Sequence, residues 1–238
     1  MNFKIISLFD GLPVKCSRGF MGWSSVYLIK IIEDNNTINI LFDTGGFNER
    51  SELTRRLKLN GVDRSQIDFI FISHLHFDHC VNWPLFPNAK ILVGEREVFN
   101  SLHSDDLNVP EFHAEKLINH PNVKLVNDGE NLFSFEIVLL PGHTYGLLGL
   151  QYDGHFLVSD AIKNRSEIND MKLMNVLDEN SAKKTIKSIS DSAKIIYPGH
   201  DGMLELVNGR WDILEDLNED IFISTLGESK FKTTIKVN

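Results

Sequence analysis

The chain has 238 residues and is acidic, with 33 Asp and Glu against 24 Lys and Arg and a formal net charge of −9, which argues against a general nucleic-acid-binding surface. A hydrophobic content of 42% and a charged content of 24% are typical of a globular protein, so we expect a single domain over residues 1–238. Without a basic and apolar leader or an apolar run near 18 residues, we expect a cytoplasmic protein that does not enter the membrane.

The first half of the chain alternates strand-like and helix-like segments. Leu53, Leu57 and Leu59 recur among basic residues, a spacing typical of a surface helix. The predicted strands cover residues 3–9, 26–32, 37–42, 68–73 and 90–93, and the predicted helices cover residues 49–59 and 95–102. The polar stretch 100–121 is predicted to be an excursion over the edge of the site.

The second half is richer in strands. Asp178 is a plausible N-cap for a helix, because its short carboxylate can accept from the first free backbone amides. The predicted strands cover residues 123–127, 132–140, 147–152, 155–159 and 194–197, and the predicted helix covers residues 178–189. No repeat, low-complexity tract or dividing linker interrupts this order, which indicates one α/β domain.

The most informative motif is Ser73-His74-Leu75-His76-Phe77-Asp78-His79, which follows the apolar run 69–72. A buried strand at 69–72 would place these side chains on the loop at its C-terminal end, where α/β folds usually place their sites. Imidazole and carboxylate together suit zinc, iron or manganese. Simple packing does not explain so dense a cluster, because such groups are rarely buried without partners.

Three further segments supply metal-binding side chains just after strand-like runs. His143 follows Pro141-Gly142, Asp160 follows the run 156–159, and His200 follows Pro198-Gly199. Five histidines and two aspartates fit two metal ions bridged by one carboxylate. The predicted metal ligands are therefore His74, His76, Asp78, His79, His143, Asp160 and His200.

In this order the motifs resemble those of the metallo-β-lactamase superfamily, from about Asp43 to His200, with Asp43-Thr44-Gly45-Gly46 as a weaker match. The resemblance implies an α/β fold, the four-layer αββα sandwich, with its site along one edge of two sheets. It assigns one metal to His74, His76 and His143, and the second to Asp78, His79 and His200. It also implies that Asp160 bridges the ions and that Asp43 orients the site by hydrogen bonds from outside.

The expected activity is metal-dependent hydrolysis of a small ester, lactone or thioester. Two divalent ions, expected to be zinc with iron or manganese as alternatives, would hold a hydroxide at neutral pH and polarise the carbonyl under attack. We expect Asp78 or Asp160 to act in catalysis by passing the proton to the leaving group. The expected partner is therefore a small-molecule substrate.

Departures from known branches of the superfamily narrow this expectation. True zinc β-lactamases place a cysteine where this chain has Asp160, and RNA-processing members carry an inserted domain that is missing here. Too few residues follow His200 for the long helical domain of glyoxalase II proteins. Acyl-homoserine lactonases carry a tyrosine where this chain has Lys163; Tyr145 could substitute, although packing is its simpler role.

Alternative functions remain open at the level of sequence. A mononuclear iron sulfur dioxygenase acting on persulfides would use His74, His143 and Asp160, and members of that group share a pair like His200-Asp201. A phosphodiester hydrolase would use the same two metals. A non-catalytic binding protein is the third class, and such proteins usually lose metal ligands that this chain retains.

Several other side chains have two possible roles. Phe20 and Trp23, in the loop 19–24, could cover the metals or cap the core. Lys163 and Arg165 are predicted to be solvated, with contact to an anionic substrate group as the alternative. The histidines of the stretch 100–121 are predicted to lie on the surface: His103, His113 and His120. Cys80 is predicted to be a small buried hydrophobic residue, and with Cys16 it indicates no disulfide framework.

Overall fold

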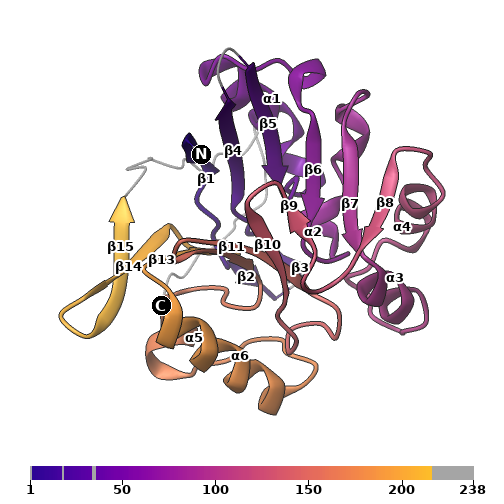
Figure 1. Ribbon diagram of the computed structural model, residues 1–238. Helices are drawn as coiled ribbons and strands as arrows, with labels where there is room; N and C mark the ends of the chain where they lie inside the picture. The colour runs from indigo at the N-terminus through magenta and orange to yellow at the C-terminus, as the bar shows by residue number, and fades with distance from the viewer. Residues whose placement is uncertain (1, 18, 34–35, 216–238) are drawn as a thin grey trace, which may run out of the picture.

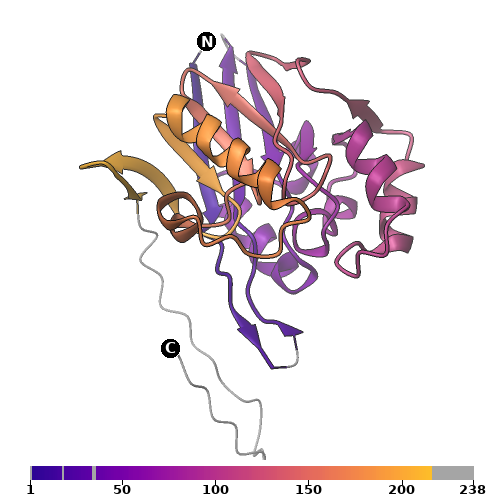
Figure 2. The same ribbon diagram turned by 90° about the horizontal axis from the view of Figure 1, so that it is seen from below.

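The computed structural model describes residues 2–17, 19–33 and 36–215, which form two β-sheets packed face to face with helices on both outer sides (Figures 1 and 2). Residues 1, 18, 34–35 and 216–238, which fall inside the predicted domain, lie outside the described residues. Within the described residues, no helix combines the length and apolar character that crossing a membrane requires.

The first sheet contains the strands of the N-terminal half. Its first three strands are antiparallel, and from β5 onward each strand runs parallel to its neighbour because helical segments connect them. In spatial order the strands are β1 (Asn2–Phe9), β4 (Val26–Glu33), β5 (Asn36–Phe42), β6 (Phe69–Ile72), β7 (Lys90–Gly94) and β8 (Val123–Val126). Between β1 and β4 in the chain, a small hairpin of β2 (Lys15–Cys16) and β3 (Gly19–Phe20) projects away from the sheet (Figure 2).

The second sheet contains the strands of the C-terminal half. Its parallel pair is β12 with β13, which α5 (Arg165–Asp170) and α6 (Glu179–Ser192) connect. In spatial order the strands are β15 (Arg210–Glu215), β14 (Met203–Val207), β13 (Ile195–Pro198), β12 (His155–Ser159), β11 (Leu148–Tyr152), β10 (Phe135–Leu139) and β9 (Asn131–Leu132).

The remaining helical segments connect strands of the first sheet. They are η1 (Phe47–Glu49), α1 (Arg50–Leu59), η2 (Arg64–Gln66), α2 (Phe77–Cys80), η3 (Trp83–Leu85), α3 (Glu95–Leu102) and α4 (Glu111–Ile118). In the second half, Asp178 caps α6 as predicted, since its side chain accepts from the Ser181 amide.

Three apolar clusters fill the interfaces between the layers. Along β4, Ile29 belongs to the cluster between the sheets and Leu28 to the cluster that includes α1, because alternate side chains of a strand point to opposite faces. A third cluster joins Val158 of β12 to Ile186 of α6 on the outer face of the second sheet. Three apolar interfaces between four layers confirm the predicted αββα sandwich.

Most predicted elements are found close to their expected bounds, with a few corrections. The single strand expected over 132–140 is wrong: β9 ends at Leu132 and β10 begins at Phe135, because Phe133 turns the chain with a φ of 55°. The polar stretch 100–121 contains α4. The sequence pattern did not predict α2 and α5, whose 4 and 6 residues are too few to show a helical period. It also did not predict β2, β3, β14 and β15.

The loops that carry the predicted ligands all leave the sheets at one edge. Asp43 follows β5, the His74–His79 motif follows β6, and His200 follows β13. Asp160 follows β12, and β10 runs in the same direction two strands away, so the loop after it brings His143 to the same edge. The carboxyl ends of parallel strands gather functional side chains in this way.

Phe71 tests the packing between the sheets. Its side chain is fully buried and stacks on Phe42, with ring centroids 5.5 Å apart. Phe71→Ala should lower the free energy of unfolding by about 3–5 kcal/mol, because it removes buried apolar surface and leaves a cavity. Denaturant unfolding measures this loss. Phe99→Ala is the control, because the Phe99 side chain is 65% exposed, and a similar small effect in both variants would contradict this packing.

Candidate metal centre

All seven predicted ligands are buried at the sheet edge, and six of them fall into two groups; a third group, Asp43, His74 and His79, shares one residue with each. In each group the potential ligand atoms lie within 4.8 Å of one another. The first group is His74, His76 and His143, and the second is Asp78, His79 and His200. These are the two sets that the resemblance to the superfamily assigned to separate metals.

Asp160 lies between the two groups and turns one carboxylate oxygen to each. Its Oδ2 lies 3.2 Å from His143 Nε2, in the first group. Its Oδ1 lies 3.2 Å from His79 Nε2 and 3.3 Å from His200 Nε2, in the second. A carboxylate in this position could bind one ion through each oxygen, as the predicted bridging role requires.

The donor atoms fit metal cations better than they fit one another. His74 Nε2, His79 Nε2 and Asp160 Oδ1 are buried without a hydrogen bond. The last two lie 3.2 Å apart yet are not aligned for a hydrogen bond, as expected of atoms directed at a common point. Ligand atoms of a tetrahedral zinc site, with bonds of about 2.0–2.1 Å, are about 3.3 Å apart, close to the distances observed here.

The electrostatics of the centre disfavour a proton on His74 but favour positive charge beside the carboxylates of Asp160 and Asp78. Burial lowers the pKa of His74 well below its ordinary value, and the neighbouring rings of His79 and His76 lower it further, so this ring keeps a free lone pair. Burial alone would also lower the pKa of His79. The carboxylates of Asp160 and Asp78 outweigh burial there and raise that pKa well above its ordinary value. A divalent cation would satisfy the same field.

Asp43 holds the second group from outside. Its Oδ2 accepts from His79 Nδ1 at 2.9 Å and from the Ser159 hydroxyl at 2.8 Å, and its Oδ1 accepts from the Ser73 amide at 2.8 Å. Because Nδ1 of His79 is engaged in this way, Nε2 is the nitrogen left to face the centre. This geometry agrees with the orienting role expected for Asp43.

Each of the other histidines also has a partner for its second ring nitrogen. His76 Nε2 lies 2.9 Å from Asp106 Oδ2, so His76 faces the centre through Nδ1. His200 Nδ1 lies 2.9 Å from the Trp23 carbonyl, and His143 Nδ1 lies 2.8 Å from the Asn175 carbonyl. Neither Asp106 nor Asn175 is recognisable in the sequence, because each reaches its histidine across more than 25 residues.

Close packing explains the glycine before each of two ligand histidines. A Cβ at Gly142, whose φ is +143°, would lie 2.4 Å from the backbone of Ala182 in α6. A Cβ at Gly199 would lie 2.0 Å from Asp160 Oδ1. A side chain at either glycine would therefore displace a ligand or the helix that supports it.

A pocket of about 420 Å³ opens over the centre. Phe20 forms part of its wall and packs its ring edge-on against His200. Of the two roles considered for Phe20, its position therefore agrees with covering the ligand groups rather than capping the core. Trp23 instead packs against the core. Lys163 also lines the pocket, and the prediction that it is solvated is wrong: the residue is 5% exposed, because the loop after β12 turns its side chain inward beside Asp160.

The other side chains with uncertain roles lie away from the pocket. Arg165 pairs with Asp201 and Asp212, each 3.0 Å away, so Asp201 faces Arg165 rather than the ligand groups. Tyr145 is 43% exposed and does not line the pocket, and Cys80 is buried as predicted. The surface prediction is wrong for His113 and His120, which are half-buried because both rings pack against Trp83, whereas His103 is exposed as predicted.

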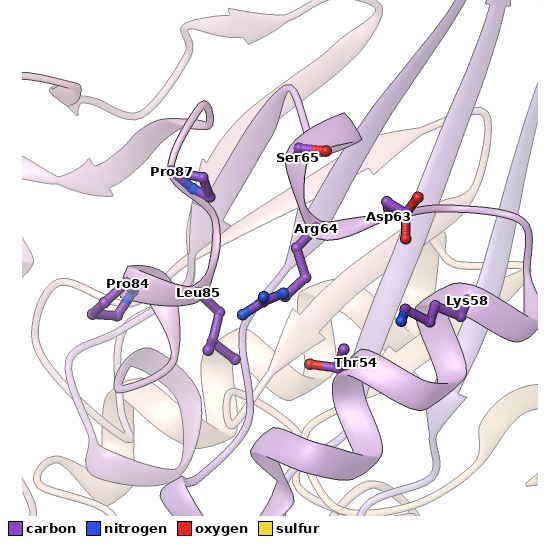
Figure 3. A pocket seen from close by; sticks show the side chains of 8 residues that line it. All are labelled: Thr54, Lys58, Asp63, Arg64, Ser65, Pro84, Leu85 and Pro87. Atoms are coloured by element: carbon purple, nitrogen blue, oxygen red, sulfur yellow. The ribbon is translucent and has the colours of Figure 1, made fainter.

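A second hollow, of about 410 Å³, lies over α1, η2 and η3 (Figure 3). Lys58 and Arg64 point toward it, and Asp63 at its edge belongs to the capping box of η2. No histidine or cysteine is among the described residues that line it, so it lacks the donor set of the pocket above Asp160.

The model of the metallo-beta-lactamase superfamily matches residues 22–200 of this chain, which therefore belongs to that superfamily. This match covers the motifs from Asp43 to His200 on which the resemblance depends. The predicted superfamily, the sandwich fold and the class of enzyme, a metal-dependent hydrolase, are confirmed.

Three individual relatives share between 20% and 29% sequence identity with this chain. A Methanocaldococcus jannaschii protein named "Probable metallo-hydrolase" is 29% identical over 168 residues, covering 69% of this chain and 72% of that protein. The N-acyl homoserine lactonase of Bacillus thuringiensis is 28% identical over 163 residues, covering 64% of this chain and 63% of that protein. AidC, a dizinc quorum-quenching lactonase, shares the fold with a TM-score of 0.64 at 20% identity, covering 84% of this chain and 82% of that chain.

Asp106 offers a test of how the histidines are held. Its hydrogen bond with His76 keeps the pKa of its carboxyl well below the usual range, so the carboxylate is charged when it meets the ring. Asp106→Asn should weaken metal binding by about 10–100-fold, the usual cost of removing such a partner. Equilibrium competition with a chelator gives the affinity. Asp105→Asn in the same exposed loop is the control, and equal affinities in the two variants would contradict the assignment.

Proposed function

We propose that this protein is a dinuclear metal hydrolase, most simply a dizinc enzyme, that cleaves a small carboxylic ester, lactone or thioester. The observation that carries the proposal is the position of Asp160, whose two oxygens face two separate groups of buried ligands. A single-metal site would leave one of these groups without a cation. The lactonases among the relatives add support for a carbonyl substrate.

Two bound divalent ions would supply a water molecule of lowered pKa and would polarise the carbonyl oxygen of the substrate. The protein residues have the remaining tasks. Asp160 and Asp78 are the carboxylates on the pocket wall, so either can hold the proton that passes to the leaving group. Phe20 and Phe77 form apolar parts of the wall beside them, which limits the access of bulk water.

Lys163 takes the position at which the superfamily's lactonases carry a tyrosine. Its Nζ lies 2.9 Å from His143 Nδ1 and 3.7 Å from Asp160 Oδ2. A ring that binds metal through Nε2 keeps its proton on Nδ1, which then donates to the Asn175 carbonyl and accepts nothing from Lys163. The ammonium group of Lys163 then faces the carboxylates of Asp160 and Glu167, at 3.7 and 3.9 Å, and the pocket.

A buried ammonium on the pocket wall favours a substrate that carries negative charge close to the scissile carbonyl. Lys15 adds a second positive charge at the pocket rim, although the protein as a whole is acidic. We therefore propose a substrate with a carboxylate or similar anionic group, held by Lys163 while its carbonyl lies over Asp160.

Metal analysis and a substrate panel test the proposed reaction. We expect two zinc ions per chain after reconstitution, and turnover of aryl esters, lactones or thioesters that exceeds turnover of a phosphodiester or a cephalosporin by at least about tenfold, or about 1.4 kcal/mol. Asp160→Ala should lose both activity and one ion, because it removes a ligand shared by both groups.

Three results would contradict the proposal. They are a stoichiometry that never exceeds one ion in excess zinc or manganese, a phosphodiester as the best substrate, and oxygen consumption with a persulfide by the iron-loaded protein. The last two would favour a phosphodiesterase and a sulfur dioxygenase, respectively.

The role of Lys163 has its own test. Lys163→Met should lower kcat/KM for an aryl ester with a free carboxylate by about 10–100-fold, since a hydrogen bond to a charged group is worth about 1.5–3 kcal/mol. The uncharged ester of the same size should change much less. Lys187→Met is the matched control, because Lys187 is exposed on α6 and does not line the pocket. Equal losses for the charged and uncharged esters would rule out recognition of the anionic group.

A further inference from the structure

Glu97 is a buried carboxylate that lies outside the pocket wall. It belongs to the first turn of α3, and its residue is 0% exposed. Among the described residues, no lysine or arginine forms an ion pair with it. A carboxylate without a cation is costly to bury unless hydrogen bonds replace its water, so the donors that surround Glu97 indicate what the side chain holds in place.

Three donors surround this carboxylate. Its Oε1 accepts from the Leu75 amide at 3.0 Å and from the Ser101 hydroxyl at 2.9 Å. Its Oε2 accepts from the Thr144 hydroxyl at 2.7 Å. Ser101 lies one turn along the same helix, but Leu75 and Thr144 belong to two other segments, which come from different sheets.

Those two segments carry the whole first ligand group. Leu75 lies between His74 and His76, and Thr144 directly follows His143. One side chain is therefore hydrogen-bonded to both segments that supply the three ligand nitrogens of this group. Asp78 and His79 of the second group lie further along the same segment as Leu75, but Asp43 orients His79 and the Trp23 carbonyl orients His200, so none of the Glu97 hydrogen bonds involves a ligand residue of the second group.

The packing of the His143 segment shows how closely it is held against α3. A Cβ at Gly146 would lie 2.2 Å from the backbone nitrogen of Glu97. The segment after His143 therefore lies directly on the start of the helix, and the Thr144 hydroxyl fixes its position there.

We propose that Glu97 is a positioning residue that holds the first ligand group together and so sets the affinity of one metal subsite but not of the other. The inference rests on the proposed two-metal function. Glu97 itself touches neither substrate nor metal; it acts through the backbone of Leu75 and the side chain of Thr144.

Metal binding should require the geometry of the three hydrogen bonds to residue 97 rather than the negative charge of the Glu97 side chain. In Glu97→Gln the amide oxygen can still accept from the Leu75 amide and the Ser101 hydroxyl. The amide nitrogen can donate to Thr144, whose hydroxyl can turn to accept. Glu97→Ala loses all three bonds and leaves the Leu75 amide buried and unpaired.

The test is a measurement of both metal affinities by chelator competition, with Zn²⁺ as the probe. In Glu97→Ala one ion should bind about 10–100-fold more weakly, whereas the other should keep its affinity. Glu97→Gln should restore most of the loss. Ser101→Ala is the matched control, because it removes a donor to the same carboxylate without touching either ligand segment, and it should leave both affinities unchanged.

Double variants identify the affected subsite. With Asp78→Ala, which weakens the second group, adding Glu97→Ala should weaken the ion that remains. With His143→Ala, which weakens the first group, adding Glu97→Ala should change little. If Glu97→Ala does not fold, Thr144→Val removes one of its bonds and should weaken the same single ion.

The outcomes separate this inference from the proposed function. A wild-type protein that binds fewer than two ions would refute the two-metal function itself. A wild-type protein with two ions, together with equal or absent losses at both ions in Glu97→Ala and Thr144→Val, would overturn only the role of Glu97.

Discussion

The structure depends on bringing the seven predicted metal ligands into one buried volume. Imidazole nitrogens and carboxylate oxygens meet there at distances near 3 Å, and three of these atoms are buried without a hydrogen bond. Such an arrangement is unfavourable in a protein interior unless a cation compensates it. The fold supplies the rigidity that keeps the groups together, and the metals would supply the missing attraction.

This rigidity comes from the sheet edge and from a layer of partners behind the ligands. Asp43 and Ser159 both adopt positive φ, 60° and 48°, a backbone conformation that costs about 1–3 kcal/mol at a residue other than glycine. Their side chains meet each other and His79. Strain at these strand ends is therefore offset by hydrogen bonds that fix a ligand, and the ligand loops cannot relax separately from the sheets.

The parts of the candidate site that follow local patterns can be predicted from the sequence. The ligand motifs are recognisable because each comes directly after an apolar strand, and the same runs predicted most of the two sheets. The side chains that hold the ligands in place are different, because their function depends on contacts between distant segments. Asp106, Asn175 and Glu97 look like ordinary surface residues in the sequence, and Lys163 looks solvated until the loop after β12 buries it.

The central claim is that two cations lie on opposite sides of the Asp160 carboxylate. Anomalous X-ray scattering from crystals of the zinc-loaded protein, with data collected on both sides of the zinc edge, tests it most directly. We predict two anomalous peaks, one next to His74, His76 and His143, and one next to Asp78, His79 and His200, with Asp160 between them. A single peak in zinc-saturated crystals, or two peaks that do not share Asp160, would contradict this account.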